Sequence, residues 1–282
     1  MFTSRKIAVL GNKDLGKYAV KFDGNNDRIS VARDSDLDAG TSPFAISIWV
    51  KMTRGTEDEQ FVGKGIMGMV WPTNDMGWAI GYKNVVDDVG QFRFDSHYYA
   101  DASNKALAAL NLTYAELGID FDDLDNKWIH LAGTRTTHDA DGTHNPSGVN
   151  SKYKFFFNGE KYETVTAVDG GTLDLLAADG AIDDNTQNFR VGVDATNGRD
   201  FQGSVSDVAY YKGEILEDDI MRIYSAGRDA FNHGNWEKSN ALTLWWKMGD
   251  GTENGLGRTI YDMSSNSYNG TLANDAEIVQ ST

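Results

Sequence analysis

Residues 188–227 read NFRVGVDATNGRDFQGSVSDVAYYKGEILEDDIMRIYSAG, and this stretch decides the fold. Two runs in it, FRVGV and SVSDVAYY, are rich in β-branched and aromatic residues, which favour strands. The turn-forming cluster NGRD at residues 197–200 lies between them. The sequence therefore predicts two strands separated by a turn.

A short helix is predicted directly after the second of these strands. Apolar side chains recur there at helical spacing, at Leu216, Ile220, Ile223 and Tyr224. Acidic residues occupy positions 217–219, where the positive end of a helix dipole favours anions. Gly227 supplies the residue type that most often ends a helix.

Similar strand signals continue along the chain in both directions. The run YAVKFDGNNDRISV at residues 18–31 alternates around a turn at 23–26 and predicts a hairpin. Three further runs are strand-like: PFAISIWVKM at 43–52, KWIHLAGTRTT at 127–137 and KYKFFFNGEKYE at 152–163. The Asn158-Gly159 pair is a strong signal for a two-residue hairpin turn. Regularly spaced short strands of this kind favour an all-β sandwich or barrel.

Two of these segments also resemble a known family. The phrase FDGNNDRISV at 22–31 and the strand–turn–strand–helix block at 188–227 resemble the opening and closing segments of laminin-G-like domains. These domains belong to the concanavalin A-like lectin/glucanase superfamily. The resemblance implies a two-sheet antiparallel jelly-roll sandwich over residues 17–228, with a short helix after the last core strand. Residues 1–16 would then form an N-terminal arm.

Residues 101–126, DASNKALAALNLTYAELGIDFDDLDN, interrupt the strand pattern. An apolar stripe at Ala106, Leu107 and Leu110 indicates a helix, and Thr113 with Glu116 has the spacing of a capping box. We interpret this stretch as a helical insertion between two strands.

The C-terminal extension, residues 229–282, contains a strand signal of its own. Leu242, Leu244 and Trp246 alternate with less apolar neighbours, as in a half-buried strand. The segment ALTLWWKMGDGTENGLGRTIYDMSSNSYNGTL resembles one that precedes the first strand in many laminin-G-like domains, and its placement after the domain resembles structural proteins of tailed bacteriophages. We expect the extension to fold back onto the sandwich; docking on a neighbouring chain is the alternative.

Composition limits the classes of partner. The net charge of −16 argues against nucleic acid, because few cations are left over to neutralise phosphates. It argues equally against anionic membrane surfaces. The chain has no cysteine, which rules out disulfides and thiolate metal sites. The first residues, MFTSRKIAVLGNKDLGK, lack the apolar run of a signal peptide.

A calcium site is the first candidate site. The family resemblance implies one calcium ion near the rim of the sandwich, and Asp23, Asp27 and Asp207 supply hard oxygen donors. Asp207 alternates with Val205 and Ala209, so it is expected on their face, where a buried carboxylate needs a cation or several donors. The alternative is that Asp23 caps its own turn and Asp207 lies at an exposed rim.

The polar loop at residues 137–150 is a second candidate. Its His138 and His144 are possible ligands for a transition metal, and Asp139 and Asp141 resemble the start of a calcium loop. The complete calcium-loop pattern is missing, so we interpret the loop as a solvated turn.

A sugar site is the third candidate. Lectin sites pair an aromatic face with polar groups, because sugar rings have apolar C–H faces and hydroxyl rims. The aromatic residues expected in loops or at strand ends are Trp71, Tyr98, Tyr99 and Trp236. Packing against the core is the alternative for each of them.

No catalytic motif is apparent. Glucanases of this superfamily carry two acids and an aspartate as E-x-D-x-x-E on one strand, and no strand-like run here reproduces that pattern. The acidic run EILEDD at 214–219 belongs to the predicted helix start. We therefore predict a protein that is not an enzyme.

Three functional hypotheses remain, of which a glycoside hydrolase with a degenerate site is the least favoured. The first is a structural protein of the virion surface, such as a capsid decoration, fibre or tail component, which contacts other virion proteins or copies of itself and binds host glycans. Synthesis in a host cytoplasm and release by lysis would explain a lectin-like fold without an export signal. The alternative is a stand-alone, calcium-dependent carbohydrate-binding module or adhesin domain that acts outside the cell.

Overall fold

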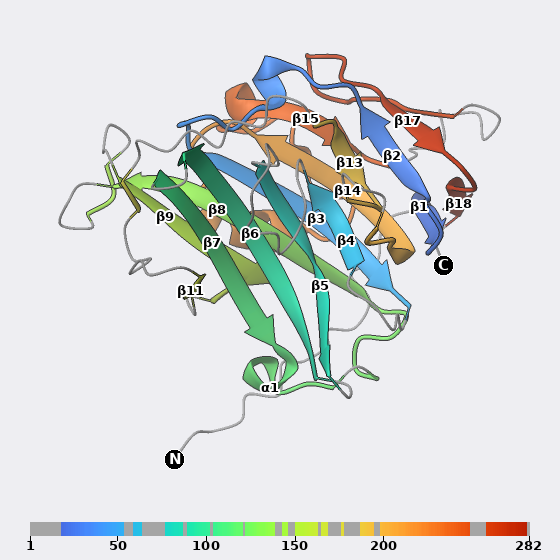
Figure 1. Ribbon diagram of the computed structural model, residues 1–282. Helices are drawn as coiled ribbons and strands as arrows, with labels where there is room; N and C mark the ends of the chain where they lie inside the picture. Colours follow the sequence, from blue (N-terminus) through green and yellow to red (C-terminus); the bar gives the residue numbers. More distant parts are fainter. Residues whose placement is uncertain are drawn as a thin grey trace.

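The computed structural model describes residues 18–53, 59–63, 77–86, 89–101, 104–120, 122–138, 143–145, 150–162, 165–168, 176–177, 187–194, 198–248 and 258–280. Within these ranges the chain forms two antiparallel sheets that stack face to face (Figure 1). Its helices are short, and none among the described residues has the length and apolar character needed to span a bilayer.

The first sheet contains strands from both ends of the chain. Its main path, in spatial order, is β10 (Glu160–Tyr162), β9 (Asn150–Phe157), β8 (Trp128–His138), β3 (Phe44–Met52), β14 (Gln202–Tyr211), β1 (Tyr18–Asp23) and β18 (Glu277–Gln280). Two strands lie off this path: β12 (Leu176–Ala177) pairs with β9, and β15 (Leu242–Trp246) pairs with β14.

The second sheet is the facing layer. Its spatial order is β11 (Val165–Val168), β7 (Asn104–Thr113), β6 (Val89–Asp101), β5 (Gly77–Val86), β4 (Glu59–Gly63), β13 (Phe189–Val191), β2 (Arg28–Val31), β17 (Gly270–Ala273) and β16 (Thr259–Ile260). The helical elements are η1 (Ser35–Leu37), α1 (Tyr114–Leu117), α2 (Glu217–Ala226) and η2 (Ser239–Ala241).

The main core lies between the two sheets. Strand β3 contributes Phe44 and every second residue after it, and the Phe44 ring meets Phe94 of β6 at 6.2 Å. A second apolar cluster lies on the outer side of the first sheet, where Ile220 and Ile223 of α2 pack on Ala132 of β8 and other small or aromatic residues. Strands β3, β8 and β14 are therefore covered along most of their length on both sides, which explains their nearly continuous burial.

The predicted fold class is confirmed, and so is the helix after strand β14. Helix α2 begins at Glu217, and Gly227 follows it with φ of +94°, a conformation that glycine adopts without strain. The Asn158-Gly159 turn also joins β9 to β10 as predicted, with positive φ at both residues.

Two predictions of local structure are wrong. The segment predicted as a helical insertion at 101–126 contains strand β7, which pairs with β6, and its helix is the single turn α1. The Thr113–Glu116 capping box is present, but it opens that one turn. Long-range pairing with β6 thus overrides the local helix preference of an alanine- and leucine-rich run.

The predicted hairpin at residues 18–31 is the second error. Strand β1 pairs with β14 and β18 in the first sheet, whereas β2 pairs with β13 and β17 in the second. The turn at 23–26 therefore carries the chain across the sandwich. Turn residues indicate a reversal of direction, and they do not specify which sheet the next strand joins.

The strands of the C-terminal extension add to both sheets. Strand β15 pairs with β14, β18 with β1, and β17 with β2. Trp246 enters the main core, where its ring meets Phe189 edge-on at 5.4 Å. Residues 1–16, predicted as an arm, lie outside the described residues.

Candidate functional site

A pocket of about 330 Å³ opens on the outer side of the first sheet, beside the start of α2. Its lining combines hydroxyl, imidazole, ammonium and carboxylate groups with two aliphatic side chains. The lining residues are Thr134, Thr136, His138, His144, Lys154, Ile215, Leu216, Glu217 and Asp218.

Strands β8 and β9 form the floor of this pocket. Because side chains alternate along a strand, Thr134, Thr136 and His138 lie on one face of β8, the face that also carries Ala132 beneath α2. Lys154 of β9 is directly opposite Thr134 in the β8–β9 ladder. The floor is therefore a regular cross-strand array, held by the backbone hydrogen bonds of a buried sheet.

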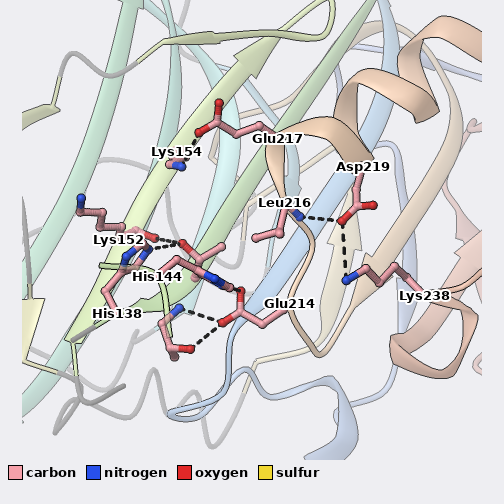
Figure 2. Close-up of polar contacts among 11 residues, drawn as sticks. His138, His144, Lys152, Lys154, Glu214, Leu216, Glu217, Asp219 and Lys238 are labelled. Atoms are coloured by element: carbon pink, nitrogen blue, oxygen red, sulfur yellow. Dashed lines mark hydrogen bonds and ion pairs between the residues drawn. The ribbon is translucent and has the colours of Figure 1, made fainter. Parts of the chain in front are cut away.

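The opposite wall is the loop after β14 and the first turn of α2. Leu216 is extended and donates its backbone N–H to Asp219 Oδ2 at 2.9 Å. Lys238 Nζ lies 3.8 Å from the same carboxylate and ties the helix start to the C-terminal extension (Figure 2). Asp219 and Lys238 thus hold this wall in place, and neither of them lines the pocket.

Glu214 braces the wall against the floor. Its Oε1 accepts hydrogen bonds from Thr137, at 2.9 Å from the backbone nitrogen and 2.5 Å from Oγ1. Its Oε2 lies 3.3 Å from His144 Nε2 (Figure 2). The His144 ring is nearly perpendicular to that of His138, with 5.5 Å between the ring centroids, and His138 Nε2 lies 2.9 Å from Thr136 Oγ1. The loop at 137–150 was predicted to be a solvated turn. Two of its residues, His138 and His144, line the pocket.

A lysine–carboxylate pair crosses the pocket. Lys154 Nζ of β9 lies 2.5 Å from Glu217 Oε1 of α2 (Figure 2). Lys161 Nζ lies 3.1 Å from the same oxygen. Burial alone would raise the pKa of Glu217, but hydrogen bonds and charge from the two lysines outweigh it and lower the pKa. Glu217 is therefore ionised at neutral pH and offers acceptors to a ligand beside the ammonium donor of Lys154.

Asp207, predicted as a metal ligand, lies in a separate and fully buried network. Trp245 Nε1 donates to its Oδ1 at 2.8 Å, and His233 Nε2 lies 3.4 Å from its Oδ2. The hydroxyl of Tyr211 in turn contacts His233 Nδ1. Burial alone would raise the pKa of Asp207, but His233 and Trp245 outweigh it and lower the pKa. The buried carboxylate thus has the hydrogen-bond donors that its burial demands.

The alternation expected around Asp207 is broken. Asp207 has φ of +50°, and the pairing of β14 with β3 shifts register between Ser206 and Ala209. Because of this bulge, Val205 packs in the main core and Ala209 in the outer cluster. The expectation that Asp207 shares one face with both neighbours is therefore wrong.

Asp23 and Asp27 lie together at the turn after β1. Asp27 Oδ2 accepts from the Asp23 backbone N–H at 2.8 Å and its Oδ1 from that of Asp275 at 2.7 Å, while Asp23 Oδ1 accepts from Asn25 N–H at 2.8 Å. Asp23 pairs with Gln202, five residues along β14 from Asp207, which places the two carboxylates roughly 16 Å apart. The three aspartates do not form one site.

The donor set therefore does not fit a calcium ion on its own. Across the described ranges, no three His, Cys, Asp or Glu side chains are grouped so that they could hold a metal ion. The carboxylates of Asp23 and Asp27 instead accept hydrogen bonds from backbone N–H groups, as in a capped turn. Calcium binding stays a prediction.

Of the aromatic residues proposed for sugar binding, Trp236 is well described, and it does not line the pocket. Trp236 packs on Tyr211 and Phe231 in the outer cluster, with the Arg222 guanidinium 5.7 Å from its ring. Tyr98 and Tyr99 lie on strand β6 of the second sheet. Trp71 lies outside the described residues.

Comparison with known proteins agrees with this architecture. A family model described as the concanavalin A-like lectin/glucanases superfamily matches residues 23–221. The chain belongs to this superfamily. No protein with a curated description matches the sequence.

Solved structures of similar fold come from several sources. A candidate carbohydrate-binding protein from Bacteroides ovatus is similar over 94% of this chain and 60% of its own length, with 19% identity and a TM-score of 0.55. The CBM40 domain of a Ruminococcus gnavus sialidase, solved with α2,3-sialyllactose, is similar over 73% of this chain and 95% of its own, with 14% identity and a TM-score of 0.44. At 19% identity the likeness to the Bacteroides ovatus protein concerns the fold alone.

Sequence reasoning missed most of the pocket residues. The alternation of Thr134, Thr136 and His138 with Arg135 and Thr137 was visible and indicates one shared face. The contact between Lys154 and Glu217 could not be predicted from sequence. The two residues are 63 positions apart, and only the packing of α2 on β9 brings them together.

Proposed function

We propose that this protein is a lectin-like, non-enzymatic carbohydrate-binding protein, and that the pocket beside α2 holds the sugar. The observation that carries the proposal is the pocket's mixed lining. Leu216 is exposed and offers an aliphatic surface for the C–H face of a sugar ring, and Thr134 and Thr136 line the floor with hydroxyls. A volume of about 330 Å³ falls within the range of small-ligand sites.

The state of Glu217 supports binding rather than hydrolysis. A glycosidase needs one carboxylic acid whose pKa is raised, so that it can protonate the leaving oxygen. The two lysines lower the pKa of Glu217 instead and keep its carboxylate charged. This carboxylate is suited to accept hydrogen bonds from sugar hydroxyls.

Glycan-array screening of the purified chain, followed by calorimetry with the best ligand, tests the proposal. We expect micromolar to millimolar binding that Thr136→Val weakens about fivefold or more, because a buried hydrogen bond is worth about 1 kcal/mol. Glu277→Gln is the control, since Glu277 lies on β18 and is exposed. The proposal is wrong if no glycan binds, or if Thr136→Val and Glu277→Gln behave alike.

For the biological setting we propose a place on the surface of a virion, as a capsid decoration, fibre or tail component that contacts other virion proteins or copies of itself. The resemblance of the C-terminal segment to structural proteins of tailed bacteriophages supports this setting. Mass spectrometry of purified particles tests it: the chain should be present in stoichiometric amounts, and its absence from particles would remove this part of the proposal.

A stand-alone calcium-dependent carbohydrate-binding module or adhesin domain is the competing proposal. It rests on the family resemblance and on Asp23 and Asp27, which lie together at one turn although backbone N–H groups already bond to their carboxylates. This alternative predicts that EGTA abolishes glycan binding and that Trp71→Ala does the same. Binding that persists in EGTA would leave the pocket beside α2 as the site that needs no metal.

A further inference from the structure

We infer that the pocket beside α2 selects neutral sugars with two adjacent hydroxyls and discriminates against glycans that carry a carboxylate. This inference rests on the proposed function and adds the class of ligand. Two independent observations carry it: the hydrogen-bonding pattern of the Lys154–Glu217 pair, and the balance of charge around the pocket.

The Lys154–Glu217 pair presents a donor and an acceptor side by side. A sugar hydroxyl both donates one hydrogen bond and accepts others. Of two neighbouring hydroxyls, one can therefore donate to the free carboxylate oxygen of Glu217 while the other accepts from Lys154 Nζ. Lys154 Nζ contacts Glu217 Oε1, so the second carboxylate oxygen of Glu217 lies beside the ammonium group, and the two groups can reach neighbouring hydroxyls of one ring. Thr134 and Thr136 add neutral hydroxyls across the floor.

The balance of charge opposes an anionic ligand. Glu217 and Asp218 both line the pocket, and Glu214 braces its wall. Lys154 lines it as well, and Lys161 also lies beside Glu217, so two lysines stand against the three carboxylates of Glu214, Glu217 and Asp218. A glycan carboxylate would have to compete with Glu217 for Lys154 while approaching Asp218, on a chain with a net charge of −16. A neutral sugar neither competes with Glu217 for Lys154 nor is repelled by Asp218.

The arrangement makes Glu217 the residue that sets the class of ligand. Replacing Glu217 by glutamine keeps the size of the side chain and removes the charge that compensates Lys154 and Lys161. The variant pocket should therefore bind neutral sugars less well and carboxylate-bearing sugars better. A residue that merely shaped the pocket would change both affinities by the same factor.

Calorimetry with a matched pair of ligands tests this inference. The pair is a neutral oligosaccharide found on the array and the same oligosaccharide with a terminal sialic acid. We expect the unaltered chain to prefer the neutral ligand about tenfold or more, because one charge-assisted hydrogen bond is worth at least that factor. Glu217→Gln should reduce this ratio at least about tenfold. Lys154→Met should weaken neutral binding without any gain for the acidic ligand.

Glu277→Gln is the matched control. It makes the same chemical change and the same change in net charge, at an exposed ion pair in which Lys21 Nζ lies 3.9 Å from Glu277 Oε1. It should leave the ratio of affinities as in the unaltered chain. A preference of the unaltered chain for the sialylated ligand, or an equal shift in Glu217→Gln and Glu277→Gln, would overturn the inference while leaving carbohydrate binding intact. Failure to bind any glycan would instead overturn the proposed function.

Discussion

At the scale of single residues, Asp207 combines a left-handed backbone with a fully buried carboxylate. Its left-handed backbone lies in a bulge of β14, at the point where the strand beside it changes from β1 to β15. Its carboxylate lies within hydrogen-bonding distance of Trp245 and His233, which belong to the C-terminal extension. Asp207 thereby links the extension to the sandwich. The sequence indicated that a carboxylate here needs partners, but the partners are 26 and 38 residues away and could not be identified from local pattern.

We expect Asp207→Asn to lower the free energy of unfolding by roughly 2 kcal/mol, the worth of a hydrogen bond to a buried charge. Asparagine tolerates the left-handed region, so the change isolates the loss of charge from backbone strain. Urea denaturation measures the difference, with Glu277→Gln as an exposed control expected within about 0.5 kcal/mol of the unaltered chain. Equal stabilities for Asp207→Asn and the unaltered chain would show that the network contributes little.

Asp229 gives the fold a pH dependence. Burial, together with the charge of nearby Asp207, raises the pKa of Asp229 to about 7. Because the pKa is higher in the folded chain than in the unfolded chain, the stability that this group contributes is present at acid pH and is lost as pH rises toward 7. The free energy of unfolding of Asp229→Asn, relative to that of the unaltered chain, should therefore rise by roughly 1 to 4 kcal/mol as the pH increases from 4 to 8.

Thermal or urea unfolding across this pH range checks the Asp229 prediction. Burial also raises the pKa of Glu59, to about 8, but that contribution is common to both chains and cancels in their difference. A difference in stability that stays constant with pH would contradict the raised pKa of Asp229.

At the scale of elements, the turn between β9 and β10 shows how local signals and packing combine. The Asn158-Gly159 pair was recognisable from sequence because it suits a two-residue turn with positive φ. The sequence did not reveal that Tyr224 of α2 packs against this turn, or that Asn158 Oδ1 accepts from the His130 N–H at 2.9 Å. The same limit explains the error over β7, whose strand state depends on pairing with β6.

Gly159→Ala tests that packing. A Cβ at this position would lie 2.6 Å from the Tyr224 ring, in addition to the strain of φ +78°. We expect a loss of about 2 to 3 kcal/mol in the free energy of unfolding. Gly118→Ala is the matched control, because Gly118 has φ of +65° and no neighbour within 4 Å of an added Cβ. It should lose about 1 kcal/mol, from backbone strain alone. Equal losses at the two glycines would mean that Tyr224 moves aside without cost.

At the scale of the whole molecule, the two ends of the described chain are joined through the sheets. Strand β1 lies between β14 and β18, and β2 lies between β13 and β17. Alternating apolar residues predicted that strands of this kind exist. Their distribution between two sheets depends on which edges remain open once the central strands have paired, and that is a property of the assembled sandwich. The pocket beside α2 shares this dependence, since its two walls come from segments that meet only after the first sheet is complete.

Removal of the last strands should therefore destabilise the entire sandwich rather than release a separate domain. A chain that ends after residue 257 lacks β16, β17 and β18. Ile29 of β2 then loses its cross-strand neighbour Leu272, and one edge each of β1 and β2 is left unpaired. We expect this truncation to unfold well below the temperature of the full chain, or to aggregate through the open edges. A chain that ends at residue 280 keeps β18 and is the control, with a melting temperature like that of the full chain. If the longer truncation melts at the same temperature as the full chain, β16, β17 and β18 are an appendage, and the residues up to 257 suffice for the fold.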